Sequence, residues 1–145
     1  KLADVLKALV EGIDSEGGRY RVVRVRHTAD TSFLGLTAAR LSGSGYGIGI
    51  QAKGTAVIHQ KDRFPHLNLE LFSMAPITSL DHYRRLGANA ARFARGETPE
   101  PVLVAYNGDA MLAKHHVATA MLFAIETAAA DPYALPEELH LEFRR

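Results

Sequence analysis

The chain has 145 residues, of which 47% are hydrophobic and 23% charged, and its net charge is +1. This composition is typical of one globular domain, expected to span residues 1–145, and it gives no support for binding to nucleic acid or to a membrane. The absence of cysteine excludes disulfides, a thiol nucleophile and Cys-ligated metal sites. No basic segment precedes an apolar stretch near the start, so we expect a cytoplasmic protein without a signal peptide.

The first third of the chain predicts a helix, a strand and a second helix. Apolar residues recur at helical spacing in Leu2–Ile13, and valines between arginines in Arg19–His27 favour a strand. The helix that follows has Thr28, Asp30 or Thr31 as its candidate N-cap.

Short strands and one long helix are predicted in the middle of the chain. Tyr46–Gln51 and Thr55–Gln60 are expected to be strands separated by AKG, whereas Leu67–Phe72 is ambiguous between a strand and a helical turn. A helix capped by Thr78 or Ser79 follows, and its arginines are interpreted as a solvated face or a contact between subunits.

The last elements predicted are a strand at Val102–Tyr106, a helix at 111–130 and a strand at Leu139–Phe143. Helices and short apolar strands therefore alternate along the chain. This order favours an α/β architecture with a largely parallel sheet, in which ligands bind at the loops that follow the strands.

Five glycines and one lysine, Lys53, lie in the segment Leu41–Gln60, LSGSGYGIGIQAKGTAVIHQ. The segment does not match the dinucleotide pattern G-x-G-x-x-G, the phosphate loop G-x-x-x-x-G-K-[ST] or the nucleophile elbow G-x-S-x-G. Glycines would let the backbone approach a bulky ligand, with Lys53 as a donor to a phosphate or amide oxygen. Spacing alone favours the alternative, a glycine-rich strand packed under a helix with Lys53 in solvent.

Other polar residues also have two interpretations. Asp30 could bind a ligand or cap the following helix, and capping is favoured. Asn68 suits an amide-bearing ligand or a local turn, and His59 or His66 could donate to a ligand. No histidines have metal-ligand spacing, and no nucleophile, base and oxyanion donor form a catalytic set, so the residues alone favour a binding domain without a metal site.

Three consecutive segments carry a resemblance to a known family. They are RVVRVRHTADTSF (Arg21–Phe33), the run LSGSGYGIGIQAKGTAVIHQKDRFPHLNLELFSMAP (Leu41–Pro76) and YRRLGANAARFARGETPEPV (Tyr83–Val102). Together they strongly resemble the medium (β) subunit of adenosylcobalamin-dependent diol and glycerol dehydratases. The likeness covers roughly Glu11–Val102 and weakens past Tyr106.

The resemblance implies a Rossmann-like, open, largely parallel sheet flanked by helices in a single domain. It implies the non-catalytic middle chain of a lyase with large, medium and small subunits, assembled as a dimer of heterotrimers and contacted transiently by a reactivating factor. In this family the large subunit converts 1,2-propanediol into propionaldehyde or glycerol into 3-hydroxypropionaldehyde. The medium subunit closes the lower face of adenosylcobalamin, so the isolated chain is expected to be inactive. Its location would be the cytoplasm or a bacterial microcompartment.

The family residues that hold the corrin amides and nucleotide loop match Asp30, Lys53, Thr55, Asn68 and Ser73. The resemblance assigns these five to cofactor binding, and it assigns no catalytic residue and no protein ligand to the metal. The chain lacks D-x-H-x-x-G, in keeping with a cobalamin that retains its own dimethylbenzimidazole on cobalt. His66 stands where relatives often carry leucine.

Relatives have a longer N-terminal portion with an apolar first strand, so we expect that strand to be missing or supplied by another chain. One alternative is the small subunit of the dehydratase reactivating factor, a chaperone-like module of similar fold. The presence of both QAKGT and Asn68 argues against it. A stand-alone phosphate-handling enzyme that uses Lys53 is a third candidate, opposed by the failed phosphate-loop order.

Overall fold

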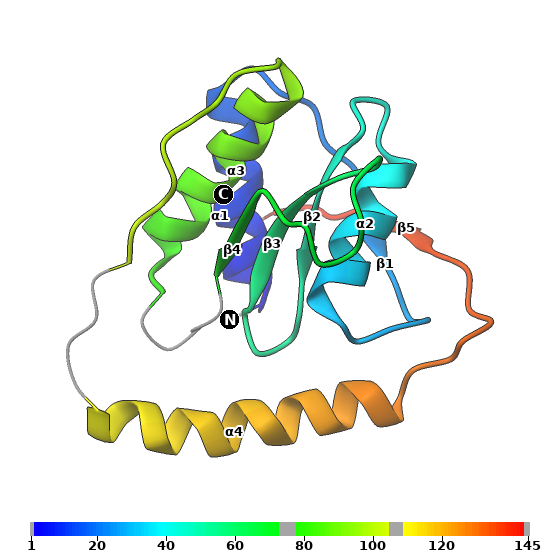
Figure 1. Cartoon of the computed structure of the whole chain (residues 1–145), viewed down its shortest axis with the longest axis vertical. Coiled ribbons are helices and arrows are strands. Elements are labelled where there is room, and N and C mark those ends of the chain that lie inside the picture. The colour runs from blue at the N-terminus through cyan, green and yellow to red at the C-terminus, as the bar shows by residue number, and fades with distance from the viewer. Residues whose placement is uncertain (1, 73–77, 105–108, 144–145) are drawn as a thin grey trace.

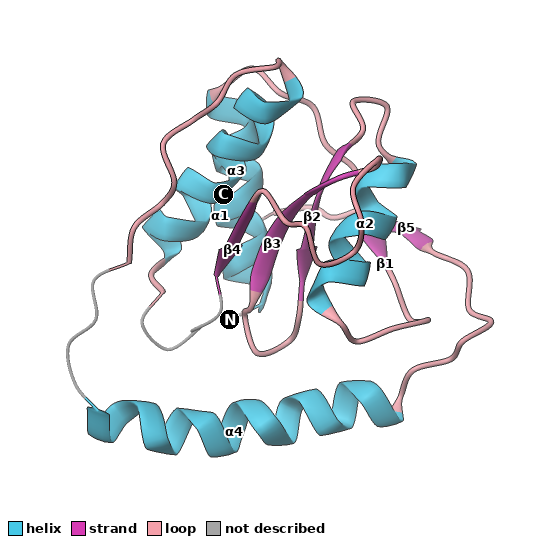
Figure 2. Ribbon diagram, viewed as in Figure 1, coloured by secondary structure: helices cyan, strands magenta, loops and turns pink. Residues whose placement is uncertain are grey.

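The computed structural model describes residues 2–72, 78–104 and 109–143 (Figures 1 and 2). Its helices are α1 (Leu2–Ser15), α2 (Thr31–Leu41), α3 (Leu80–Ala94) and α4 (Asp109–Ala128). Its strands are β1 (Val22–Arg24), β2 (Tyr46–Ile50), β3 (Ala56–Gln60), β4 (Glu70–Phe72) and β5 (Glu137–Leu139). The predicted helices are confirmed, and Leu67–Phe72 is resolved as a strand from Glu70 onward.

Both sheets are antiparallel, so the expected Rossmann-like, largely parallel sheet is wrong. One sheet has the order β2-β3-β4, with Ile58 opposite Ile48 and Glu70, and the other pairs β1 with β5. The connection from β2 to β3 has only the residues 51–55. A parallel pair needs a crossover of about a dozen residues or more, so this short connection requires a hairpin.

The three-stranded sheet lies between α2 on one face and α3 with α1 on the other (Figure 1). Successive residues of β3 point to opposite faces. Ile58 joins the core cluster that includes Leu9 of α1 and Leu86 of α3, whereas Val57 faces α2 at Gly35. The side chains of Ile58 and Leu86 are fully buried, so this side of the sheet is the centre of the core.

Two glycines of β2 allow α2 to lie directly on the strand. A Cβ added at Gly49 would lie 2.3 Å from the backbone nitrogen of Gly35, and one at Gly47 would lie 2.3 Å from that of Ala39. No other residue permits such an approach without moving the helix. The interpretation of Gly47 and Gly49 as part of a strand packed under a helix is therefore confirmed. The interpretation that these two glycines let the backbone approach a ligand is wrong.

Arginines in and directly after α3 pair with glutamates in and directly after α1. Arg84 lies 2.9 Å from Glu11, and Glu16 receives Arg92 at 2.5 Å and Arg95 at 2.8 Å. The hydrogen bonds from Arg92 and Arg95 lower the pKa of Glu16, and their charges add to this effect. These arginines join two helical segments of one chain and stay 41–44% exposed, so the predicted solvated face is confirmed, and the alternative of a subunit contact stays a prediction.

The last predicted strands differ from the structure. Residues 102–104 form no strand, and Ala105 and Tyr106 lie outside the described residues. Val102 is nevertheless buried, and its N–H donates to the Glu70 carboxylate at 2.7 Å. The final strand precedes the predicted Leu139–Phe143 and overlaps it only at Leu139. No helix in the described ranges has both the length and the hydrophobicity needed to cross a membrane.

Candidate functional site

The loop Gln51–Thr55, called the QAKGT loop below, closes the β2–β3 hairpin. Within it, the Gln51 N–H donates to the Thr55 carbonyl at 3.0 Å and the Gly54 N–H donates to the Gln51 carbonyl at 2.9 Å. Gly54 has a φ of +93°, a conformation that glycine adopts without strain. The turn itself therefore fixes the backbone of the loop.

Side chains from two directions attach this loop to the body of the protein. The Tyr83 hydroxyl of α3 donates to the Gly54 carbonyl at 2.6 Å. The Gln51 amide nitrogen donates to the carbonyl of Ala29, which directly precedes the α2 cap residue. Burial raises the pKa of Tyr83, although a hydrogen bond with Thr78 opposes this shift, so the phenol stays a neutral donor. The loop is consequently held rigidly between α3 and the start of α2.

Four buried side-chain oxygens have no hydrogen-bond partner within the described residues. Gln51 (Oε1) and Thr55 (Oγ1) belong to the QAKGT loop, Glu126 (Oε2) reaches it from α4, and Asn68 (Oδ1) lies at the other end of β3. Buried polar atoms are nearly always paired in folded proteins, because an unpaired one costs about 1–3 kcal/mol. Two of these residues, Thr55 and Asn68, were predicted to bind a ligand. Their unpaired oxygens are suitable acceptors for the N–H groups of an amide-bearing ligand.

Asp30 and Lys53 have contacts within the chain. Oδ1 of Asp30 accepts hydrogen bonds from the N–H groups of Ser32 at 2.9 Å and Phe33 at 3.1 Å, which confirms capping of α2. The ammonium group of Lys53 lies 5.3 Å from the centroid of the Phe123 ring of α4, within the range of a cation–π interaction. Lys53 is therefore only partly open to solvent, whereas the spacing had favoured a solvated lysine.

The predicted site residues are not all at one position. Asp30, Lys53 and Thr55 lie at the end of the sheet where β2 passes into β3. Asn68 precedes β4, whose first residue, Glu70, is opposite Ile58, so Asn68 lies about 10 Å or more from Thr55 along the strand direction. Ser73 lies outside the described residues. A ligand that contacts both Thr55 and Asn68 must therefore be large.

His59 and His66, the two histidines that could donate to a ligand, have contacts within the chain. The buried ring of His59 has Nδ1 2.8 Å from the Gln60 carbonyl and Nε2 2.8 Å from the Pro65 carbonyl, so both nitrogens contact backbone. His66 packs edge-on against Phe33, with 5.9 Å between ring centroids. Across residues 2–72, 78–104 and 109–143, no group of three or more His, Asp or Glu side chains is placed to hold a metal ion.

The sequence interpretation missed three residues around the QAKGT loop: Gln51, Tyr83 and Glu126. Alternation along β2 gives the clue for Gln51, because it places this long polar side chain on the same face as Gly47 and Gly49. Tyr83 and Glu126 reach the loop from α3 and α4, far along the sequence, so no local pattern predicts them.

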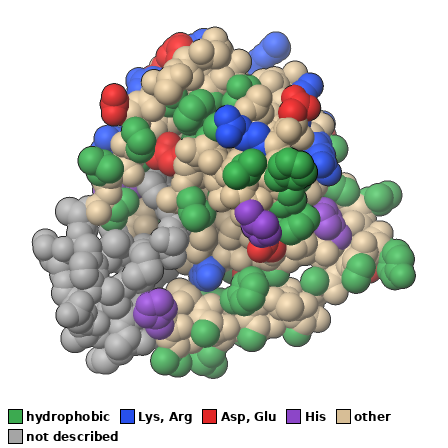
Figure 3. All heavy atoms as spheres, viewed as in Figure 1, with side chains coloured by type: hydrophobic (Ala, Val, Ile, Leu, Met, Phe, Trp, Pro, Cys, Tyr) green, Lys and Arg blue, Asp and Glu red, His purple; other side chains and the backbone are tan. Residues whose placement is uncertain are grey.

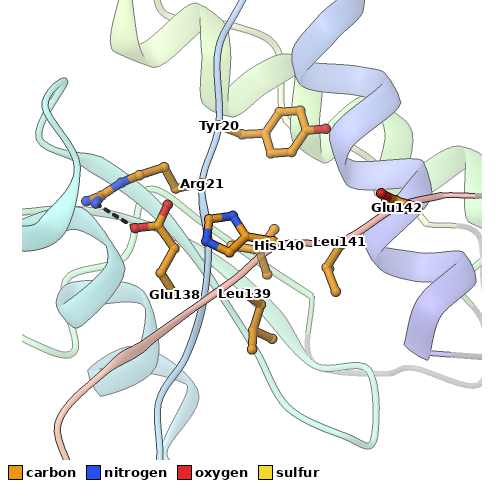
Figure 4. A pocket seen from close by; sticks show the side chains of 8 residues that line it. Tyr20, Arg21, Glu138, Leu139, His140, Leu141 and Glu142 are labelled. Carbon is orange, nitrogen blue, oxygen red and sulfur yellow. Dashed lines mark hydrogen bonds and ion pairs between the residues drawn. The ribbon is translucent and has the colours of Figure 1, made fainter.

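A cavity of about 520 Å³ lies away from this loop, along β1 and the segment that begins with β5. Figure 4 shows Arg21 and Glu138 paired at one side of it, with Tyr20 and His140 nearby. The ion pair between Arg21 and Glu138 is 3.4 Å long and both side chains are about half exposed. None of the predicted cofactor residues lines this cavity, so it is separate from the candidate site.

Two comparisons with known proteins give matches whose descriptions both name a dehydratase. The model of the family described as "Dehydratase medium subunit" matches residues 1–100. A solved structure, "Glycerol dehydratase reactivase", is 26% identical with a TM-score of 0.62, over 68% of this chain and 86% of that chain. The family match ends before α4 begins.

Proposed function

Because the chain belongs to the dehydratase medium subunit family, we propose that it is the medium subunit of an adenosylcobalamin-dependent diol or glycerol dehydratase. Membership of this family makes the chain a subunit of a dehydratase, a lyase with several subunits. The proposal adds that the cofactor is adenosylcobalamin and that this chain contacts its lower side. In it, the QAKGT loop and Asn68 face the lower side of the corrin, opposite the large catalytic subunit.

The observation that supports this role most strongly is the set of unpaired buried oxygens on Gln51, Thr55 and Asn68. The rim of a corrin carries amides, whose N–H groups can donate to these oxygens, and the nucleotide loop carries one phosphate, which suits a single cation such as Lys53. The separation of Thr55 and Asn68 along the sheet also requires a broad ligand. The residues present therefore fit the cofactor.

The residues of this chain bind and orient, and the reaction takes place elsewhere. When bound, adenosylcobalamin supplies the radical chemistry of the dehydration. Lys53 would donate to an anionic or carbonyl oxygen, and the Thr55 hydroxyl would accept from or donate to a corrin amide. The Asn68 side chain would donate through its amide nitrogen and accept through its oxygen. Asp30 keeps Oδ1 for the α2 cap, so only its second oxygen is offered to a ligand. No group in this set is placed as an acid–base pair, and the isolated chain is proposed to be inactive.

The likeness to the glycerol dehydratase reactivase favours a second candidate, the small subunit of a reactivating factor. Such a subunit would bind a large partner as a chaperone and would have no use for unpaired oxygens directed toward a cofactor. The two candidates therefore differ in both partner and cofactor content.

Co-purification of the full chain from its native host separates the two candidates. We expect recovery with a larger and a smaller dehydratase subunit, together with the absorption spectrum of a bound corrinoid. Recovery with a single large reactivating subunit and no corrinoid would support the second candidate and contradict the first.

A further inference from the structure

Helix α4 contacts the QAKGT loop at the groups that a ligand would use. The N–H of Ala52 donates to the Oε1 atom of Glu126 at 2.8 Å, and the Lys53 ammonium lies 5.3 Å from the Phe123 ring centroid. Phe123 and Glu126 are three residues apart, so they lie on one face of α4. A carboxylate and an aromatic ring thus occupy a backbone donor and the loop cation at the same time.

The packing of α4 differs from that of the other helices. Its described side chains are apolar around much of the circumference, yet Val117, Met121 and Ile125 are 64%, 62% and 63% exposed. Figures 1 and 3 show α4 lying across one end of the molecule, with hydrophobic side chains along its length. The core cluster contains residues of α1, β3 and α3 and none of the described residues of α4. The described side chains of α4, residues 116–128, therefore pack on the domain surface and outside the core.

Glu126 also carries an unpaired atom. Its Oε2 is buried and has no hydrogen-bond partner among the residues that the structure describes. A buried carboxylate oxygen without a partner is unfavourable, so the contact between Glu126 and the loop is held at a cost. Release of α4 would return this oxygen to water.

We propose that α4 is an internal cover of the candidate cofactor site, held closed by Glu126 and Phe123, and that it leaves the QAKGT loop when cobalamin binds. This inference rests on the proposed function. The Ala52 N–H and the Lys53 ammonium cannot serve α4 and a ligand at once. Closed molecules are therefore not competent to bind, and the apparent affinity is reduced by the fraction that is closed.

Amide exchange and cofactor binding together test the cover. The variants are Glu126→Ala and Phe123→Ala, each compared with Ile125→Ala, which shortens an exposed apolar side chain of the same helix. In the full chain, we expect faster NMR-detected exchange of the Ala52 amide in the two test variants and no change in Ile125→Ala. In the complex with the other dehydratase subunits, we expect the test variants to bind adenosylcobalamin about threefold to tenfold more tightly.

Each outcome separates the cover from the proposed function. Unchanged exchange of the Ala52 amide in both test variants would overturn the contact and with it the cover. Faster exchange with unchanged cobalamin affinity would also overturn the cover, while Lys53→Ala in the same complex would still report on the site. If Lys53→Ala binds cobalamin as tightly as the parent, the proposed site is wrong, and α4 then covers no cofactor site.

Discussion

The hydroxyl group of Tyr83 donates a hydrogen bond of 2.6 Å to the carbonyl oxygen of Gly54, and so joins α3 to the loop that carries Lys53 and Thr55. Tyr83 and Gly54 are both buried. One of the two contacts that position the candidate site relative to the core is therefore a phenol that lies 29 residues away in the sequence.

Replacement of Tyr83 by phenylalanine removes this donor and leaves the ring in place. We expect the free energy of unfolding to fall by about 1–3 kcal/mol, because the buried Gly54 carbonyl loses its partner. Urea denaturation followed by circular dichroism measures the change. Tyr133→Phe, at a side chain that is 93% exposed, is the control and should have no effect. Equal stability of the two variants would show that the hydrogen bond contributes nothing.

The pairing of Glu16 with Arg92 and Arg95 predicts a pH dependence of stability. These hydrogen bonds lower the pKa of Glu16 in the folded chain, so the folded state favours the charged carboxylate. The stabilisation is complete above the ordinary pKa of glutamate and is lost as the pH falls through the lowered value. Between about pH 5 and pH 3, the urea midpoint should fall more steeply for the parent than for Glu16→Gln. Parallel pH profiles would contradict this assignment.

The close contact between β2 and α2 predicts that Gly49→Ala is strongly destabilising. The added methyl group would lie 2.3 Å from the Gly35 nitrogen, so α2 must move away from the sheet. We expect a loss of about 2 kcal/mol or more, as for other overpacked cores. Gly43→Ala is the matched control, since an added Cβ there meets nothing within 4 Å. A thermal midpoint for Gly49→Ala close to that of Gly43→Ala would show that the helix adapts without cost.

Replacement of Thr55 by valine separates binding from stability. The hydroxyl is buried and has no partner in the part of the chain that the structure describes, so its removal should leave the free chain equally stable or slightly more stable. The same change should weaken adenosylcobalamin binding by the assembled complex by about tenfold, because one hydrogen bond to the cofactor is lost. Thr98→Val, at an exposed loop position, is the control. A destabilised Thr55→Val chain with unchanged cofactor affinity would indicate a structural role for this hydroxyl.

Local patterns predicted the helices well, because amphipathic spacing and caps are encoded within each segment. Ser79 caps α3 with a reciprocal contact to His82, and Asp30 caps α2, as the sequence suggested. Strand pairing depends on contacts between distant residues, and there the prediction failed. The alternation of helices and strands favoured a parallel sheet, although the short connection between Gln51 and Thr55 already required a hairpin.

The C-terminal strands were misplaced for the same reason. Val102 is buried as an apolar strand residue would be, but its N–H bonds to the Glu70 side chain in place of a neighbouring strand. The register of β5 follows its pairing with β1, where Glu137 lies within 3.7 Å of Arg24 and 3.4 Å of Arg26. Neither contact leaves a periodic pattern in the sequence.

The candidate site was predicted in part. Thr55 and Asn68 came from a family resemblance, and the structure adds an independent physical observation, namely their unpaired buried oxygens. Gln51 shares this property and was not predicted. The contact of Lys53 with Phe123 depends on the fold of a segment beyond the matched family region, so neither spacing nor resemblance could reveal it.

The affinity of the assembled dehydratase complex for adenosylcobalamin, measured with Lys53→Ala and Asn68→Ala, tests the proposed cofactor site most directly. Arg85→Ala is the control, because Arg85 is an exposed cation of α3 that is not assigned to the cofactor site. We predict that each test variant raises the dissociation constant about tenfold or more and that the control leaves it unchanged. Dissociation constants equal to that of the parent in both test variants would contradict the assignment of this loop and Asn68 to cobalamin.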